Sequence, residues 1–184
     1  MARIVHLFDN PERFVVGTVG QPGERTFFLQ ARSGNRLISV ALEKQQVDLL
    51  ADRMTELLDQ VANLEGIQIV NSAPADLEPL DSPIEEEMRV GTIALGWNSV
   101  TAQVVVEAHA VTEFLEDVPE LEEDSELGPD VLRVRISGTY ARGFCTRAKS
   151  VVAAGRPNCP LCENPLDPRG HICPRANGYK RRGI

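Results

Sequence analysis

The fold class is decided by residues 26–64, which read TFFLQARSGNRLISVALEKQQVDLLADRMTELLDQVANL. The first part holds two runs rich in apolar residues, 26–32 and 36–42, separated by Ser-Gly-Asn. Since Gly and Asn accept a positive φ, this pattern predicts an antiparallel hairpin. The period then changes, and apolar residues recur every three or four positions, as on the buried face of an amphipathic helix. These residues are Val47, Leu50, Met54, Leu57, Leu58, Val61 and Leu64.

The rest of the chain continues this alternation of strands and helices. The patterns predict further strands at 3–8, 14–19, 87–97, 100–110 and 131–137, and a second helix at 140–154. Closely spaced strands joined by short turns favour antiparallel pairing. The expected fold is therefore α+β, an antiparallel sheet or sheets with two packed helices and a small C-terminal zinc-knuckle segment. We expect an α+β body at 1–155 and a zinc-binding basic module at 156–184.

Two acidic segments interrupt the body. Residues 71–87 are rich in proline and acids, and we expect a solvated loop. Residues 112–130 are also acidic but carry interspersed apolar side chains, so we expect this segment to dock on the body. The last strand, 131–137, alternates apolar and basic residues, which predicts a half-exposed strand with Arg133 and Arg135 on its outer side.

The charge of the chain is unevenly distributed. The net charge is −8, but residues 1–136 carry 10 Lys and Arg against 25 Asp and Glu, while residues 137–184 carry 9 against 2. No apolar stretch approaches the ~20 residues that span a bilayer, and residues 1–14 lack the apolar core of a secretory signal. We therefore expect a cytoplasmic protein without a membrane partner.

The one pattern with specific chemistry lies near the C-terminus. Cys159-Pro-Leu-Cys162 is followed, after eight residues, by His171-Ile-Cys173. A C-x-x-C turn directs two sulfurs at one point, and thiolates with an imidazole suit zinc in tetrahedral geometry. Four protein ligands close the coordination shell, so the sequence predicts structural zinc rather than catalytic zinc. Reduced thiols and a redox-active pair are the alternative interpretations.

The identity of the fourth ligand stays open at the level of the sequence. Cys145 could replace His171, because His171 and Cys173 are only two positions apart. Against this, Cys145 falls on the apolar stripe of the second predicted helix. A buried cysteine that packs as a small hydrophobe is the favoured interpretation.

Basic side chains around the predicted zinc site suggest a binding surface. They are Arg142, Lys149, Arg156, Arg175, Tyr179, Lys180, Arg181 and Arg182. We expect a non-catalytic binding or adaptor protein that offers this surface to an acidic protein partner. A nucleic-acid-binding protein is one alternative, because cations neutralise phosphates and Tyr179 could stack on a base. An enzyme of unknown reaction, with a site near His6 or His109 in the sheet, is the other.

Two stretches of the sequence carry a family resemblance. The opening IVHLFDNPERFVVGTVGQPGERTFFLQA (4–31) and the closing AAGRPNCPLCENPLDPRGHICPRANGY (153–179) resemble the actinobacterial family of uncharacterised proteins known as DUF3090. The resemblance covers essentially the whole chain. It implies a cytoplasmic bacterial protein and supplies no activity.

Overall fold

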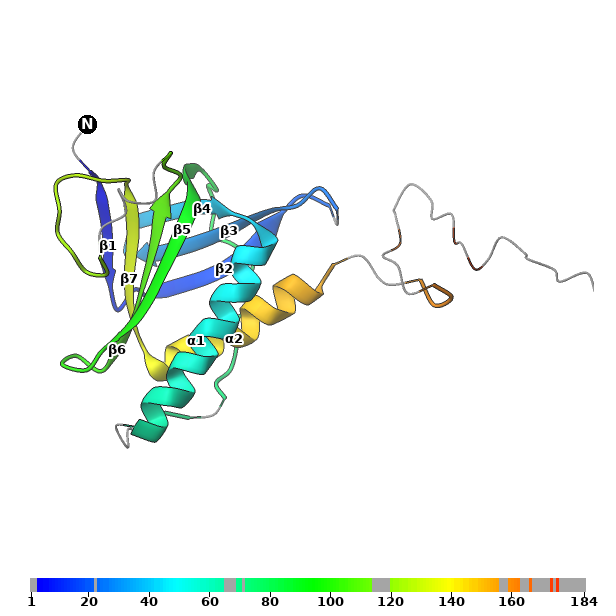
Figure 1. The fold of residues 1–184 in the computed structure, drawn as a ribbon. Helices are drawn as coiled ribbons and strands as arrows, with labels where there is room; N and C mark the ends of the chain where they lie inside the picture. The colour runs from blue at the N-terminus through cyan, green and yellow to red at the C-terminus, as the bar shows by residue number, and fades with distance from the viewer. Residues whose placement is uncertain are drawn as a thin grey trace, which may run out of the picture.

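The structure, a computed structural model, describes residues 3–21, 23–64, 69–70, 72–113, 120–155, 159–162, 166, 173 and 175. Within these residues it contains two helices and one seven-stranded sheet of order β1-β7-β6-β5-β4-β3-β2 (Figure 1). The elements are β1 (Val5–Asp9), β2 (Arg13–Val19), β3 (Thr26–Ser33), β4 (Arg36–Leu42), α1 (Lys44–Leu64), β5 (Glu86–Asn98), β6 (Gln103–Ala110), β7 (Val131–Ser137) and α2 (Gly138–Ala153).

The α+β class is confirmed, but the prediction of a purely antiparallel sheet is wrong, because the sheet is mixed. β2, β3 and β4 pair antiparallel, as the turn residues indicate, and so do β5, β6 and β7. β4 and β5 run parallel because α1 returns the chain to the same end of the sheet between them. β1 pairs parallel with the distant β7, with Val5 opposite Val131.

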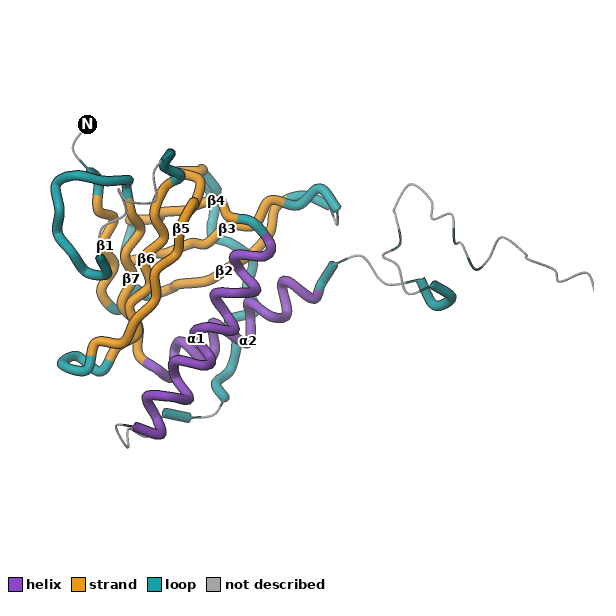
Figure 2. The backbone as a smooth tube through the Cα atoms, in the orientation of Figure 1, coloured by secondary structure: helices purple, strands orange, loops and turns teal. Residues whose placement is uncertain are grey.

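The connectivity forces the sheet to curl. β1 and β2 follow each other in the chain but lie at opposite edges, joined only by residues 10–12. Four Cα–Cα steps reach at most about 15 Å, whereas seven flat strands would separate the edges by about 29 Å. Consistent with this, Arg36 of β4 donates a 2.8 Å hydrogen bond to the carbonyl of Leu7 in β1. Figure 2 shows β2, β3 and β4 crossing β1, β6 and β7 at a steep angle.

Both helices pack on one side of the curled sheet and against each other (Figure 1). The predicted stripe of α1 is confirmed, since Val47, Leu50, Met54, Leu58 and Val61 are buried. Ser137 is the N-cap of α2, and its Oγ accepts a hydrogen bond from the backbone N–H of Tyr140. Ala141, Phe144, Cys145 and Ala148 of α2 are buried, and the Phe144 ring stacks on Phe14 at 4.8 Å.

The first acidic loop is tied to the body rather than simply solvated. The Asp76 carboxylate accepts a 2.7 Å hydrogen bond from Nε of Arg13 and a 3.1 Å bond from Nη1 of Arg147. Both arginines are more than nine-tenths buried. The bond to Arg13 holds the pKa of Asp76 below its usual range, even though partial burial opposes ionisation. This loop therefore neutralises two cations, one at the start of β2 and one on α2.

The same loop explains a glycine inside α2. A Cβ at Gly143 would lie 2.5 Å from the carbonyl oxygen of Pro74, a contact with backbone that cannot move as a side chain would. Gly143→Ala is expected to lower the free energy of unfolding by about 1–2 kcal/mol, because overpacking outweighs the gain of about 1 kcal/mol in helix propensity. Denaturant unfolding measures this value. Gly155→Ala is the control, because its Cβ would meet only ordinary contacts of 3.8–3.9 Å; equal stability of the two variants would contradict the prediction.

The prediction of a half-exposed β7 is wrong at Arg133. Its side chain is only 2% exposed and pairs with Glu107 of β6, which is fully buried. Residues 120–130 lie over this face of the sheet, as shown by a hydrogen bond from the backbone N–H of Glu122 to Glu107. The docking expected for the second acidic segment is thus observed for its described part.

None of the helices in the described residues is long and apolar enough to cross a bilayer.

Candidate metal centre

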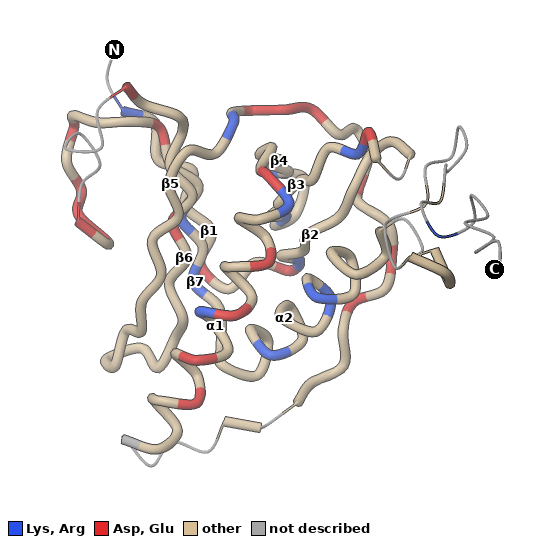
Figure 3. Tube along the Cα trace, turned by 45° about the vertical axis from the view of Figure 1, so that its right-hand side comes forward, with Lys and Arg blue, Asp and Glu red and all other residues tan. Residues whose placement is uncertain are grey.

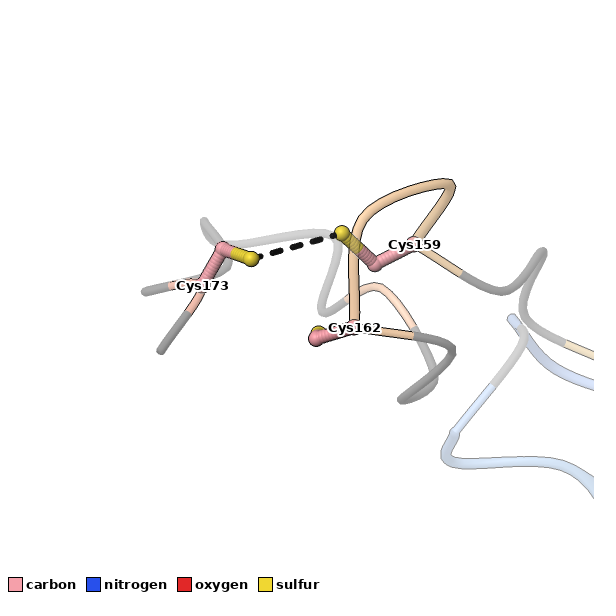
Figure 4. Close-up of side chains that lie close together, drawn as sticks. All are labelled: Cys159, Cys162 and Cys173. Atoms are coloured by element: carbon pink, nitrogen blue, oxygen red, sulfur yellow. Dashed lines mark hydrogen bonds between the residues drawn. The ribbon is translucent and has the colours of Figure 1, made fainter. Parts of the chain in front are cut away.

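Three of the four predicted ligands come together in the structure. The sulfur atoms of Cys159, Cys162 and Cys173 all lie within 4.8 Å of one another (Figure 4). Cys159 and Cys173 are buried, and Cys162 is partly exposed. The short turn at 159–162 places the first two sulfurs on one side, and Cys173 reaches them from a later part of the chain.

The separation of the sulfurs fits a shared metal ion. The Sγ atoms of Cys159 and Cys173 are 3.7 Å apart, and the cysteines form no disulfide. Two sulfurs bound at ~2.3 Å to one tetrahedral ion lie about 3.8 Å apart, whereas a disulfide bond measures about 2.05 Å. The donor set and its spacing therefore match a tetrahedral thiolate site with three protein sulfurs. The three cysteines could bind a metal ion.

The backbone of the turn prepares one of these thiols for ligation. The N–H groups of Cys162 and Leu161 point at the sulfur of Cys159 and, with the neighbouring thiols, lower the pKa of Cys159 to about 6. A thiolate is the form that binds metal, so at neutral pH this side chain is mostly in its ligating state. Arg175 donates a 2.9 Å hydrogen bond to the carbonyl of Leu161, which ties the chain after Cys173 to the turn.

One known family matches most of the chain, including the cysteine segment. The family model described as "Protein of unknown function (DUF3090)" matches residues 6–173. The chain belongs to the DUF3090 family. The matched region of this DUF3090 protein ends at Cys173 and so includes all three clustered cysteines. No curated protein and no solved structure matches the chain.

The fourth predicted ligand, His171, and its alternative, Cys145, have different outcomes in this DUF3090 protein. His171 lies outside the described residues, so its role as fourth ligand stays a prediction. Cys145 lies in the core of the body, where burial raises the pKa of its thiol. It is not part of the three-cysteine group found among the described residues. This agrees with the interpretation of Cys145 as a small core hydrophobe.

Two of the predicted surface cations instead hold the helices of the DUF3090 body together. Arg142 is 6% exposed and donates to Asp59 of α1. Nζ of Lys149 lies 2.5 Å from Asp48 and 2.7 Å from Asp52, also on α1. Figure 3 shows basic positions (blue) on α2 and acidic positions (red) on the neighbouring α1. Of the other predicted surface residues, Arg175 is exposed, and Arg156, Tyr179, Lys180, Arg181 and Arg182 lie outside the described residues.

The two histidines considered for an enzymatic site lie on strands of the sheet, His6 on β1 and His109 on β6. His109 is fully buried, whereas His6 is partly buried and lies 3.7 Å from Glu87. Among the described residues, one cavity of about 300 Å³ lies between α1 and β5 and another of about 450 Å³ lies beside the start of α2. Neither is lined by a histidine.

A buried ionic cluster was not predicted from the sequence. Glu107, His109 and Arg133 are all at most 2% exposed, and Nε2 of His109 lies 3.1 Å from Oε2 of Glu107. Burial opposes the ionisation of Glu107. His109, the N–H of Glu122 and Arg133 together outweigh burial and hold the pKa of Glu107 below its usual range. The sequence carries one sign of this cluster, since Glu107 is a single acid within the otherwise apolar run 104–108.

Proposed function

We propose that this DUF3090 protein is a non-catalytic binding protein whose C-terminal segment is organised by structural zinc. Cys159, Cys162, His171 and Cys173 would hold the ion. The observation that carries this proposal is the 3.7 Å separation of two sulfurs within a group of three. Thiolate-rich tetrahedral sites favour zinc over the hard cations that prefer oxygen ligands.

A structural role follows from the number of ligands. Three thiolates and one imidazole would complete a tetrahedral shell and leave no open position for substrate or activated water. The segment around the cysteines is rich in proline and has few large apolar residues. A metal ion would then supply the cohesion that a hydrophobic core supplies in a larger domain.

The binding surface in this proposal is smaller than the sequence suggests. Arg142 and Lys149 already pair with α1, so their charges do not contribute to a free basic surface. The surface is assigned to the cations after α2, namely Arg156, Arg175, Lys180, Arg181 and Arg182, with Tyr179 among them. An acidic protein is the proposed partner, and it would meet these residues close to the zinc ion.

The metal content of the purified chain tests the proposal. Native mass spectrometry is expected to find one zinc ion per wild-type chain. His171→Ala removes one of four ligands, so zinc affinity in a competition with a chromophoric chelator is expected to fall at least about tenfold. His6→Ala is the matched control and retains wild-type affinity, because His6 lies on β1. Wild-type protein that carries no zinc, or in which the cysteines are disulfide bonded, would refute the proposal.

A further inference from the structure

The described end of the second acidic segment covers one face of the sheet. We call residues 120–130, ELEEDSELGPD, the acidic strap; it contains six acids and no basic residue. It reaches β7 and passes beside β1 (Figure 1). Beneath it lie Arg3, Arg133 and Arg135, which we call the arginine face.

The side chain of Arg3 binds the main chain of the strap. Its Nε donates a 3.1 Å hydrogen bond to the carbonyl of Pro129, and its Nη1 donates at 3.0 Å to the carbonyl of Glu123 and at 3.4 Å to that of Ser125. A side chain that donates to several peptide carbonyls recognises a peptide by its main chain. The same contacts would be available to any acidic peptide of suitable conformation.

The two arginines of β7 add recognition of carboxylates. Nη1 of Arg133 donates at 2.6 Å to Asp124, and its Nη2 donates at 2.9 Å to the carbonyl of Glu123, which Arg3 also contacts. Nε of Arg135 donates at 2.8 Å to Glu122. Charge-assisted bonds of this kind are the strongest hydrogen bonds that a peptide offers to arginine.

The strap leaves polar atoms of this face without partners. Five buried side-chain polar atoms in the described residues have no hydrogen bond, and four of them lie here. Two of the four, Oε2 of Glu107 and Nε2 of His109, lie 3.1 Å apart as an ion pair. The other two, Nη2 of Arg3 and Nδ1 of His109, have neither a hydrogen bond nor an ion pair within the described part of the chain. Buried polar groups are nearly always hydrogen bonded in folded proteins. The closed strap therefore satisfies the face incompletely.

The strap is also weakly anchored by apolar contacts. Leu121 packs over Gly96, but Leu127 is 78% exposed, as is 84% of the Asp124 side chain. Glu122 adopts a φ of 63°, in the left-handed region that is unfavourable for residues other than glycine. Segments with few buried apolar contacts open locally at a small fraction of the cost of global unfolding.

From these observations we infer that the acidic strap is a displaceable cover, and that the arginine face binds an acidic peptide segment of another protein. The strap mimics this ligand and competes with it. A peptide is the ligand because Arg3 binds three main-chain carbonyls, which nucleic acids lack. The inference goes beyond the proposed zinc module, and because the arginine face lies on the sheet, Cys159→Ser does not affect it.

A strap with weakened ion pairs tests this inference. The probe is a fluorescent synthetic peptide with the sequence of residues 120–130, added to the full-length chain at low salt. Glu122→Gln combined with Asp124→Asn removes the strap carboxylates that pair with Arg135 and Arg133. Loss of these ion pairs raises the fraction of molecules in which the strap is displaced from the arginine face. The variant is therefore expected to bind the probe about tenfold or more tightly than the wild type. Adding Arg135→Gln to the same variant is expected to abolish most of this gain.

A matched control separates the opening of the strap from a general loss of negative charge. Glu24→Gln combined with Glu85→Gln changes the net charge equally at exposed sites and is expected to leave probe binding unchanged. If the strap variant binds the probe no better than the wild type, or binds a short single-stranded oligonucleotide more tightly, the inference is wrong. If the strap variant fails to fold, hydrogen exchange of the wild-type protein tests the inference instead. Excess probe is expected to accelerate exchange of the Glu122 amide, because displacement of the strap breaks its hydrogen bond to Glu107. An unchanged exchange rate would refute displacement.

Discussion

Replacing Cys159 with serine is expected to release the proposed zinc ion from the C-terminal segment while leaving the body folded. A serine hydroxyl stays protonated at neutral pH and is a poor zinc ligand, whereas the thiol of Cys159 has a pKa of about 6. Structural zinc contributes about 10–16 kcal/mol of apparent folding free energy in small peptides. Its loss should therefore leave the segment after α2 without fixed structure. Native mass spectrometry and limited proteolysis measure the two effects.

Cys145→Ser is the matched control for this experiment. It also removes a thiol, but one that lies in the core of the body beside α1. This variant is expected to keep one zinc ion per chain and to lose stability in the body, because a hydroxyl replaces a buried apolar group. The reverse outcome, in which Cys145→Ser loses zinc and Cys159→Ser retains it, would show that the cluster has been assigned to the wrong cysteines.

Glu107→Leu is expected to destabilise the body strongly. The change leaves Arg133, which is 2% exposed, without its buried counter-charge. Removing one partner of a buried pair costs about 3–5 kcal/mol. The midpoint of denaturant unfolding should fall, with little change in its slope. The double variant Glu107→Leu/Arg133→Leu should recover part of the loss, and a single variant as stable as the wild type would refute this role.

The same carboxylate predicts how stability depends on pH. The pKa of Glu107 is lower in the folded protein than in the unfolded chain. Its contribution is therefore present above the ordinary carboxyl range and is lost as pH falls through the folded pKa. The difference in unfolding free energy between the wild type and Glu107→Leu should narrow in acid. A difference that widens as pH falls would contradict this assignment.

Local patterns were sufficient for much of this structure. The Ser-Gly-Asn turn predicted the β3–β4 hairpin, and the helical period predicted the buried stripe of α1. The spacing of Cys159, Cys162 and Cys173 predicted that the three sulfurs would converge. In each case the signal lies within a few residues or in residue types whose chemistry is specific.

Long-range pairing could not be predicted in the same way. Nothing near Val5 indicates that it pairs with Val131, because a strand's sequence does not specify a distant partner. Arg133 follows the alternation of an exposed position and is buried only because residues 120–130 cover it and Glu107 neutralises it. Likewise, Arg142 and Lys149 were assigned to a surface because the acids of α1 that pair with them lie far away in the sequence.

The pairing of β1 with β7 has a consequence for synthesis on the ribosome. β1 is synthesised before every other element of the sheet, yet its hydrogen-bonding neighbour β7 is translated only after the other five strands and α1. Until then the nascent chain carries an unpaired apolar edge, which is a target for chaperones and for association with other chains. Completion of the sheet must wait for β7, and such distant contacts slow the final step of folding.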